Sequence, residues 1–314
     1  MSHTHTAALD AAVSTATPTI SVRPVVLAAT DRGADLQVRV TAPATGRDLP
    51  IIVFSHGFGE SMDGYAPLVE FWAAHGFAVL QPTHLDSQTL GLAPDDPRTA
   101  IIWRFRIEDL TGALDALDVI EAAVPGLAGR LDRGRIAVAG HSWGATTASA
   151  LLGARVLDHA GRAGQDMTDP RVTAGVLLAV AGTGGDDLTP FAAEHFSFMN
   201  PSFAEMATPA LVVAGDQDQS PLAKRGPDWW TDAYTLSPAA KSMLTLFGAE
   251  HSMGGIAGYS THETTDWSLE RIALIQQVST AYLRSTLNIE HESWAHVRAA
   301  LTNAPDPLGV LDSK

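Results

Sequence analysis

Six short, nearly continuous apolar runs are the feature that most restricts how this chain of 314 residues can fold. Runs of this length and composition are typical of strands that are buried on both faces of a sheet. Helix-length segments lie between them, and the clearest carries Leu110, Leu114, Leu117 and Ile120 at helical spacing. Buried strands that alternate with helices predict an α/β fold, with a mainly parallel sheet and helices on both faces. The six runs occupy residues 50–55, 77–82, 135–140, 175–181, 210–215 and 243–248.

Two further strands and a set of helices complete the expected order of elements. Residues 20–28 and 35–43 have the composition of an opening antiparallel pair, which brings the expected sheet to eight strands. The helices are expected at residues 65–75, 102–122, 144–158, 266–287 and 292–301.

The length of the chain predicts a single domain over residues 19–314, because α/β folds often reach this size unbroken. The first 18 residues are rich in Ala, Ser and Thr without a clear period, so we expect a flexible N-terminal tail at 1–18. Residues 183–208 and 219–241 are rich in aromatic residues and too short for an independent cap domain. We expect these two segments to form a small lid and to line a pocket.

The charge balance and the absence of cysteine exclude several classes of function. The chain has 20 Lys and Arg against 35 Asp and Glu, and a net charge of −15 disfavours nucleic acid and anionic membranes as partners. Without cysteine there is no disulfide, thiolate metal site or cysteine nucleophile. No apolar run approaches the roughly 20 residues of a membrane helix, and the N-terminus does not have the pattern of a signal peptide. We therefore expect a soluble, cytoplasmic protein.

A serine between two glycines follows the third apolar run. The pentapeptide Gly140-His141-Ser142-Trp143-Gly144 fits the pattern G-x-S-x-G, and the predicted strand before it and helix after it are the context which that motif requires. The glycines would let strand and helix approach closely, so that the hydroxyl is held out at the helix N-terminus. The alternative is a glycine-rich turn capped by serine. We interpret Ser142 as a nucleophile and expect His141 to pack beneath this turn.

A serine hydroxyl needs a base to remove its proton, and the base needs an acid to orient it. His251 follows the sixth run and is the one histidine of twelve that has both a position after a strand and the chain order serine, acid, histidine. Two aspartates after the fifth run compete for the role of the acid. Asp216 directly follows the strand glycine, where it would brace the turn, whereas Asp218 reaches further toward a histidine on the next loop. We favour Asp218.

Negative charge that develops on a substrate oxygen needs fixed hydrogen-bond donors. One expected donor is the backbone amide of Trp143, directly after the nucleophile. The other is the amide of Phe58 in the loop at 55–59, where Gly57 and Gly59 permit a tight fold. An ordinary glycine turn is the alternative reading of this loop.

Aromatic and methionine side chains near the strand ends predict an apolar, adaptable pocket. The same side chains would equally well seal helices onto the sheet. We select Phe198, Met199, Trp229 and Trp230 as the candidates for contact with the substrate. Their neighbours in the two lid segments are Phe191, Phe196, Phe203 and Tyr234.

Four more residues near the strand ends have an open role. His56 and His84 follow strands and remain candidate pocket residues. Arg104 and Arg106 either reach a carboxylate on the substrate or, as is more common for such a segment, lie on a solvated helix face.

At these motifs the chain resembles the α/β-hydrolase superfamily. Within it, the chain looks most like the group of chlorophyllases, dienelactone hydrolases and type II platelet-activating-factor acetylhydrolases. The resemblance implies an α/β-hydrolase fold and a serine esterase without cofactor or metal, which acts through a covalent acyl-enzyme. It implies Ser142 as nucleophile, His251 as base, Asp218 as acid, and the amides of Phe58 and Trp143 as oxyanion hole. The stretches that carry it are VFSHGFGES, HGFAVLQPTHLDS, GHSWGATTASAL, ALVVAGDQD and GAEHSMGG, together with THLDS and the later WRFRIEDLTGALDAL.

Three functions are compatible with this sequence. The first is hydrolysis of a carboxylic ester with a hydrophobic or aryl part, for which the expected partner is a small-molecule ester. The second is acyl transfer by the same residues. The third is a ligand-binding protein that reuses a hydrolase scaffold without catalysis, against which the complete set of catalytic elements argues. The sequence leaves the oligomeric state open.

Overall fold

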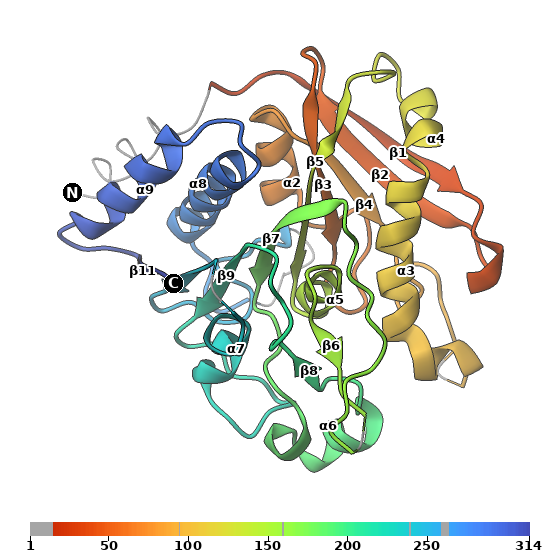
Figure 1. Ribbon diagram of the computed structural model, residues 1–314, viewed down its shortest axis with the longest axis vertical. Helices are drawn as coiled ribbons and strands as arrows, with labels where there is room; N and C mark the ends of the chain where they lie inside the picture. Colours follow the sequence, from red (N-terminus) through yellow and green to blue (C-terminus); the bar gives the residue numbers. More distant parts are fainter. Residues whose placement is uncertain (1–14, 94, 159, 239, 259–263) are drawn as a thin grey trace.

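A nine-stranded sheet forms the centre of this computed structural model, which describes residues 15–93, 95–158, 160–238, 240–258 and 264–314. In space the strands follow the order β1-β2-β4-β3-β5-β7-β9-β10-β11 (Figure 1). From β4 to β10 they are mutually parallel, whereas β1, β2 and β11 pair antiparallel at the two edges. Their bounds are β1 (Thr19–Leu27), β2 (Leu36–Pro43), β3 (Leu49–Ser55), β4 (Ala78–Pro82), β5 (Leu131–His141), β7 (Val172–Leu178), β9 (Ala210–Gly215), β10 (Lys241–Leu246) and β11 (Gly309–Ser313).

The expected mainly parallel α/β sheet is confirmed, but the expected number of eight strands is wrong. The ninth strand, β11, adds to the edge of the sheet by pairing with β10, for example Leu311 with Leu244. Only its first residue is buried. A half-exposed edge strand does not need a continuous apolar run, so the pattern that revealed the central strands did not reveal this one.

Helices cover both faces of the sheet. The helices α2 and α8 pack together on one face, and α3 and α5 lie against the other (Figure 1). Among the described residues, no helix has the length and the apolar character that crossing a bilayer requires. The α-helices are α2 (Ala66–Ala74), α3 (Ile102–Asp115), α4 (Leu117–Ala123), α5 (Trp143–Leu151), α6 (Pro190–His195), α7 (Asp232–Thr235), α8 (Leu269–Thr286) and α9 (Glu292–Thr302). Short 3₁₀ helices are η1 (Thr30–Arg32), η2 (Pro97–Ile101), η3 (Gly185–Asp187) and η4 (Pro227–Thr231).

Two helices differ in length from the expectation. The helix expected at 102–122 is divided at Ala116 into α3 and α4. The helix expected at 144–158 ends at Leu151, because Gly153 adopts a φ of 108°, a conformation that stops a helix. The chain then forms the two-residue strand β6 (Arg155–Val156), which pairs with β8 (Pro201–Ser202).

The central strands bring their carboxyl ends to one edge of the sheet. The strands β3, β4 and β9 are buried along their whole length, which explains why the sequence shows them as continuous apolar runs. Ser55 at the end of β3 lies opposite Gly140 near the end of β5. The chain leaves β3 toward β4 on one side and leaves β5 toward β7 on the other. A ligand site is therefore expected beyond the ends of β3 and β5, where the direction of the chain switches.

The two expected lid segments, 183–208 and 219–241, contact each other beside this edge. Arg225 in the second segment forms ion pairs with Asp187 of the first, at 3.2 Å, and with Asp232, at 2.8 Å. These contacts tie the two segments into one layer. We retain the proposal that this layer acts as a small lid.

The expected N-terminal tail falls mostly on residues 1–14, which lie outside the described residues. Of the rest, Thr17 donates its backbone N–H to the carbonyl of Ala74 at the end of α2, at 2.8 Å.

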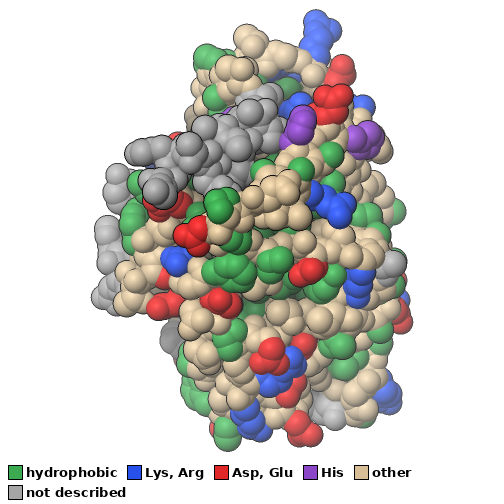
Figure 2. Space-filling view, turned by 90° about the vertical axis from the view of Figure 1, so that its left-hand side faces the viewer, with side chains coloured by type: hydrophobic (Ala, Val, Ile, Leu, Met, Phe, Trp, Pro, Cys, Tyr) green, Lys and Arg blue, Asp and Glu red, His purple; other side chains and the backbone are tan. Residues whose placement is uncertain are grey.

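On the face seen in Figure 2, the described acidic and basic side chains are interspersed with apolar ones rather than gathered by charge.

Candidate active site

The turn between β5 and α5 holds Ser142 in a backbone conformation that few residues other than glycine adopt. Its φ is 55° and its ψ is −123°. The Ser142 N–H donates to the carbonyl of Leu178 on the neighbouring strand β7, at 2.9 Å, which helps to hold the turn in place. Strain of this kind persists only where the surrounding structure fixes it, and it is concentrated at functional sites.

Two glycines make this turn sterically possible. A Cβ atom at Gly140 would lie 2.3 Å from the carbonyl carbon and oxygen of Gly144. A Cβ atom at Gly144 would lie 2.0 Å from the carbonyl oxygen of Ser55 at the end of β3. Both distances are far below a van der Waals contact with rigid backbone, so β5, α5 and β3 can approach this closely only with glycine at both positions.

Replacement of Gly144 tests this explanation of the turn. Gly144→Ala is expected to lower the free energy of unfolding by about 3 kcal/mol, because the new methyl group would push β3 and α5 apart. Urea unfolding measures this loss. Gly112→Ala is the matched control: a Cβ atom there meets nothing within 4 Å, and alanine inside α3 should raise the free energy of unfolding by about 0.5–1 kcal/mol. Equal stability of the Gly144→Ala variant and the unaltered protein would contradict this account of the turn.

The structure brings Ser142, His251 and Asp218 together from the ends of three different strands. The Nε2 atom of His251 lies 2.9 Å from the Ser142 Oγ, and its Nδ1 lies 2.8 Å from the Asp218 Oδ2. A carboxylate only accepts, so Nδ1 carries the proton and the lone pair of Nε2 faces the hydroxyl. The Asp218 side chain is fully buried, whereas that of His251 is 42% exposed and so accessible from the cavity.

Asp216 has a different place. Its Oδ1 accepts the backbone N–H of Gly248 at 2.7 Å, which joins the turn after β9 to the turn after β10. Of the two competing aspartates, only Asp218 contacts the imidazole of His251. Trp230 supports that contact, because its Nε1–H donates to the Asp218 carbonyl at 3.1 Å and its ring packs 4.9 Å from the ring of His251.

The loop after β3 is held by hydrogen bonds on both sides of Phe58. The Gly57 N–H donates to the Tyr65 Oη at 3.1 Å, and the Gly59 N–H donates to the Asp86 Oδ2 at 3.2 Å. Among the described residues, the Phe58 amide has no hydrogen-bond acceptor. The Trp143 amide begins α5 and has no acceptor within the helix. Both residues border the cavity beside Ser142, so two amides remain free for a ligand there.

Below the turn, His141 connects this loop to the loop of His251. The Tyr65 hydroxyl, which accepts from Gly57, donates to the His141 Nδ1 at 2.9 Å, and the His141 Nε2–H donates to the carbonyl of His251 at 2.9 Å. Burial, with a smaller contribution from the charge of His251, lowers the pKa of His141 to about 3. His141 is therefore neutral over the physiological range. Its Nδ1 accepts and its Nε2–H donates, so the direction of each hydrogen bond in this series is fixed.

A cavity of about 270 Å³ opens beside Ser142. None of the described side chains that line it is acidic, lysine or arginine, and His251 is its only titratable group. Of the four selected pocket candidates, Met199 and Trp230 line this cavity. The other apolar residues in its wall are Phe58, Trp143, Ala181, Phe196, Pro221 and Leu222.

The other two pocket candidates, Phe198 and Trp229, do not line this cavity. The Phe198 ring packs 5.2 Å from that of Trp143 and borders a separate small cavity of about 30 Å³. Trp229 is fully buried and donates its Nε1–H to the carbonyl of Thr183 at 2.8 Å. Each of these residues precedes one that does face the cavity, and neighbouring side chains in these segments point in different directions. Leu222 was not among the residues selected from the sequence, because one aliphatic side chain in a loop carries no periodic signal.

The expected solvated helix face at Arg104 and Arg106 is wrong for Arg106. Arg104 is exposed and lies over the ring of Trp103, but the Arg106 side chain is 1% exposed and forms an ion pair with Asp86 at 2.7 Å. It does not reach the cavity beside Ser142. The sequence contained a signal for this position, because Arg106 shares the apolar face of α3 with Leu110.

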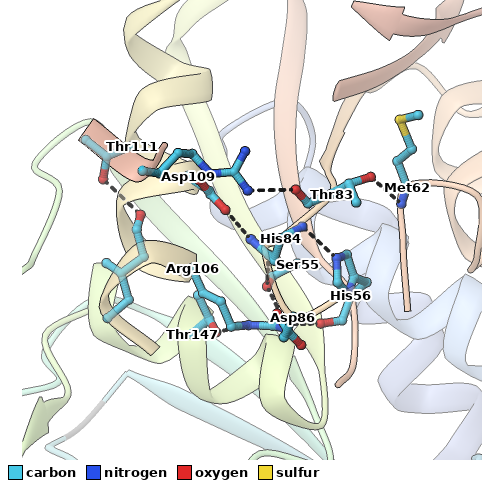
Figure 3. Close-up of polar contacts among 12 residues, drawn as sticks. Ser55, His56, Met62, Thr83, His84, Asp86, Arg106, Asp109, Thr111 and Thr147 are labelled. Carbon is cyan, nitrogen blue, oxygen red and sulfur yellow. Dashed lines mark hydrogen bonds and ion pairs between the residues drawn. The ribbon is translucent and has the colours of Figure 1, made fainter. Parts of the chain in front are cut away.

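His56 and His84 belong to a buried polar network instead of the pocket (Figure 3). The His84 Nδ1–H donates to the Asp109 carboxylate at 2.9 Å, and the His84 backbone N–H donates to the His56 Nε2 at 3.0 Å. Burial, and then the nearby charge of Arg106, lower the pKa of His56 to about 3. Within the described ranges, no group of three or more His, Asp and Glu side chains could hold a metal ion.

The comparison with known families agrees with this geometry. Residues 13–166, slightly less than half of the chain, match the chlorophyllase family. The matched stretch contains the loop of Phe58 and the turn of Ser142, whereas Asp218 and His251 lie beyond it. No curated protein matches the chain. Chlorophyllases are a family of ester hydrolases in the α/β-hydrolase superfamily, and the first half of this chain is similar to them.

Proposed function

We propose that this protein is a serine esterase that hydrolyses a neutral ester with a hydrophobic or aryl part. The observation that carries the proposal is the hydrogen-bonded series Asp218, His251, Ser142 at the wall of an apolar cavity. The chain itself supplies every group that the mechanism needs: a nucleophile, a base with its orienting acid, and two free amides.

In the acylation half of the reaction, the Ser142 Oγ attacks the carbonyl carbon of the ester while His251 Nε2 takes its proton. The Asp218 carboxylate stabilises the imidazolium that forms. The carbonyl oxygen becomes an oxyanion and receives hydrogen bonds from the amides of Phe58 and Trp143. When this intermediate collapses, the bond to the alcohol oxygen breaks, the alcohol leaves with the proton of His251, and the acyl group stays on Ser142.

Deacylation repeats these steps with water. His251 removes a proton from water as its oxygen attacks the acyl carbon, and the same two amides stabilise the second oxyanion. Ser142 then leaves as the alkoxide and recovers its proton from His251, which releases the carboxylic acid.

The cavity supports a modest and uncharged substrate group. Its volume of about 270 Å³ is close to the lower end of the range for pockets that hold drug-sized ligands. A charged group in such a cavity would lose its hydration and meet no acidic, lysine or arginine side chain, although Gln219 and Ser220 add two polar groups to the lining. A short alkyl chain or a single aromatic ring fits this description best.

Two matched p-nitrophenyl esters, one neutral and one charged, test this assignment of the substrate. In rapid mixing, p-nitrophenyl butyrate is expected to give a burst of about one p-nitrophenolate per chain, because acylation releases the alcohol before deacylation. The p-nitrophenyl monoester of succinic acid is the matched charged substrate, and its kcat/KM should be at least about tenfold lower.

The outcomes of this experiment separate the three candidate functions. A burst followed by steady release of butyric acid supports hydrolysis. A burst followed by transfer of the butyryl group to an added alcohol, without release of the acid, favours an acyltransferase. No release from short, medium-length or aryl esters would refute the proposal and favour a binding protein.

A further inference from the structure

We propose that Arg106 is a positioning residue that sets the relative placement of the two oxyanion-hole amides. This inference rests on the proposed function, because it assigns a role to the Phe58 and Trp143 amides in ester hydrolysis. Arg106 does not line the cavity beside Ser142, so it acts through the elements that carry these amides.

The guanidinium of Arg106 connects three parts of the structure (Figure 3). Its Nη1 lies 2.7 Å from both carboxylate oxygens of Asp86. Its Nη2–H donates to the carbonyl of His56, which lies two residues before Phe58 in the same loop. Its Nε–H donates to the Thr147 Oγ1 on α5 at 3.1 Å. A planar guanidinium presents its donors in a rigid fork, so these partners are held in one mutual geometry.

On the side of the loop, these contacts bracket Phe58. Arg106 binds the carbonyl of His56 before it, and Asp86 accepts the N–H of Gly59 after it. Burial would raise the pKa of the Asp86 carboxyl, but the nearby Arg106 lowers it below its usual value. Asp86 therefore stays ionised as the acceptor of the Gly59 amide.

A further hydrogen bond orients the peptide group between Gly57 and Phe58. The His56 Nδ1–H donates to the carbonyl oxygen of Gly57 at 2.7 Å. In a trans peptide the carbonyl and the following N–H point in opposite directions, so fixing this carbonyl also fixes the direction of the Phe58 N–H. Arg106 fixes the carbonyl of His56 and the His56 side chain fixes the carbonyl of Gly57, so both help to orient the Phe58 N–H.

On the side of the helix, Thr147 carries the connection to Trp143. Its hydroxyl accepts from Arg106 and donates to the carbonyl of Trp143 at 2.8 Å. The Arg106 guanidinium carbon also lies 5.7 Å from the centre of the Trp143 ring. One buried side chain therefore binds both the loop and the helix that supply the two amides.

The cost of burying this pair supports a role beyond stability. The side chains of Arg106 and Asp86 are 1% and 5% exposed. A buried ion pair is often no more stabilising than apolar residues of the same volume, so burial of such a pair is weak evidence for a purely stabilising role. Accurate placement of donors is needed at an oxyanion hole, where a displacement of about 1 Å lowers the rate by ~10²-fold.

Arg106→Lys tests the inference, because lysine keeps the charge beside Asp86 but cannot bind Asp86, His56 and Thr147 at once. We expect kcat for p-nitrophenyl butyrate to fall by ~10²-fold with KM nearly unchanged. The affinity for a trifluoromethyl ketone, which forms an oxyanion on Ser142, should fall by the same factor as kcat/KM. Inhibition by 1-butanol, an uncharged ligand that forms no such oxyanion, should not change.

Two further variants make the test decisive. Thr147→Val keeps the shape of the side chain but removes the hydroxyl that connects Arg106 to α5. We expect it to lower kcat by roughly tenfold. If Arg106→Lys does not fold, Thr147→Val is the variant that tests the inference. Arg104→Lys changes an exposed arginine on the same helix and should keep the kcat of the unaltered protein. The rate of amide hydrogen exchange in the peptide of residues 55–60 can be measured without ester turnover. This rate should be higher in Arg106→Lys than in the unaltered protein.

The inference is overturned if Arg106→Lys, or in its place Thr147→Val, folds and keeps full kcat, ketone affinity and slow exchange. It is also overturned if the affinities for the ketone and for 1-butanol fall together, because that pattern indicates general loss of structure. Absence of ester turnover by the unaltered protein refutes the proposed function instead, and the exchange experiment then still decides whether Arg106 fixes the loop.

Discussion

Ser142→Ala is expected to lower kcat for p-nitrophenyl butyrate by ~10⁵-fold or more, because no other group can form the acyl-enzyme. The fold should survive, since the Ser142 hydroxyl contacts only His251 among the described residues. Steady-state kinetics and thermal unfolding of the same samples measure the two effects.

Ser149→Ala is the control for this variant. Ser149 lies on the same helix, and its hydroxyl donates to the carbonyl of Thr146 at 2.7 Å, away from His251. Its kcat should remain close to that of the unaltered protein. Substantial turnover by Ser142→Ala would show that another residue is the nucleophile.

Asp218→Asn is expected to lower kcat by ~10⁴-fold, the second largest effect. The asparagine amide would present a donor to His251 Nδ1, which favours the tautomer that carries its proton on Nε2. That nitrogen could then no longer accept the proton of Ser142. The volume and the burial of residue 218 stay nearly the same, so the loss reports on the protonation pattern.

Asp216→Asn is the matched comparison, since it makes the same change two residues away. The asparagine oxygen can still accept the N–H of Gly248, so we expect kcat within a few fold of the unaltered protein. Loss of activity in Asp216→Asn with retention in Asp218→Asn would reverse the assignment of the acid.

The sequence predicted the central sheet well because those strands are buried on both faces. Continuous apolar runs mark such strands directly, and each of the six runs coincides with or overlaps a strand. The edge strand β11 was not predicted, because it is mostly exposed and has no continuous apolar run. The early end of α5 depends on the positive φ of Gly153, a conformation that a glycine permits but does not by itself impose.

The sequence did not predict in which direction side chains point in irregular segments. Helices and strands repeat with a fixed period, but the lid segments do not, so adjacent residues such as Phe198 and Met199 could not be told apart. The partner of Arg106 was hidden for a related reason: Asp86 lies 20 residues earlier in the chain, and only the packing of α3 brings them together. The turn around Ser142, by contrast, was predictable from the sequence. Its close backbone contacts require glycine at fixed positions, and the spacing of these glycines is a recognisable motif.

The most direct test of the central claim is to treat the protein with a fluorophosphonate and locate the adduct by peptide mass spectrometry. The reagent captures a serine only where a neighbouring base activates its hydroxyl. One adduct per chain, on Ser142, is predicted, and its formation should be lost in His251→Ala. An active protein whose adduct lies on any other residue, or which forms none, would contradict the account.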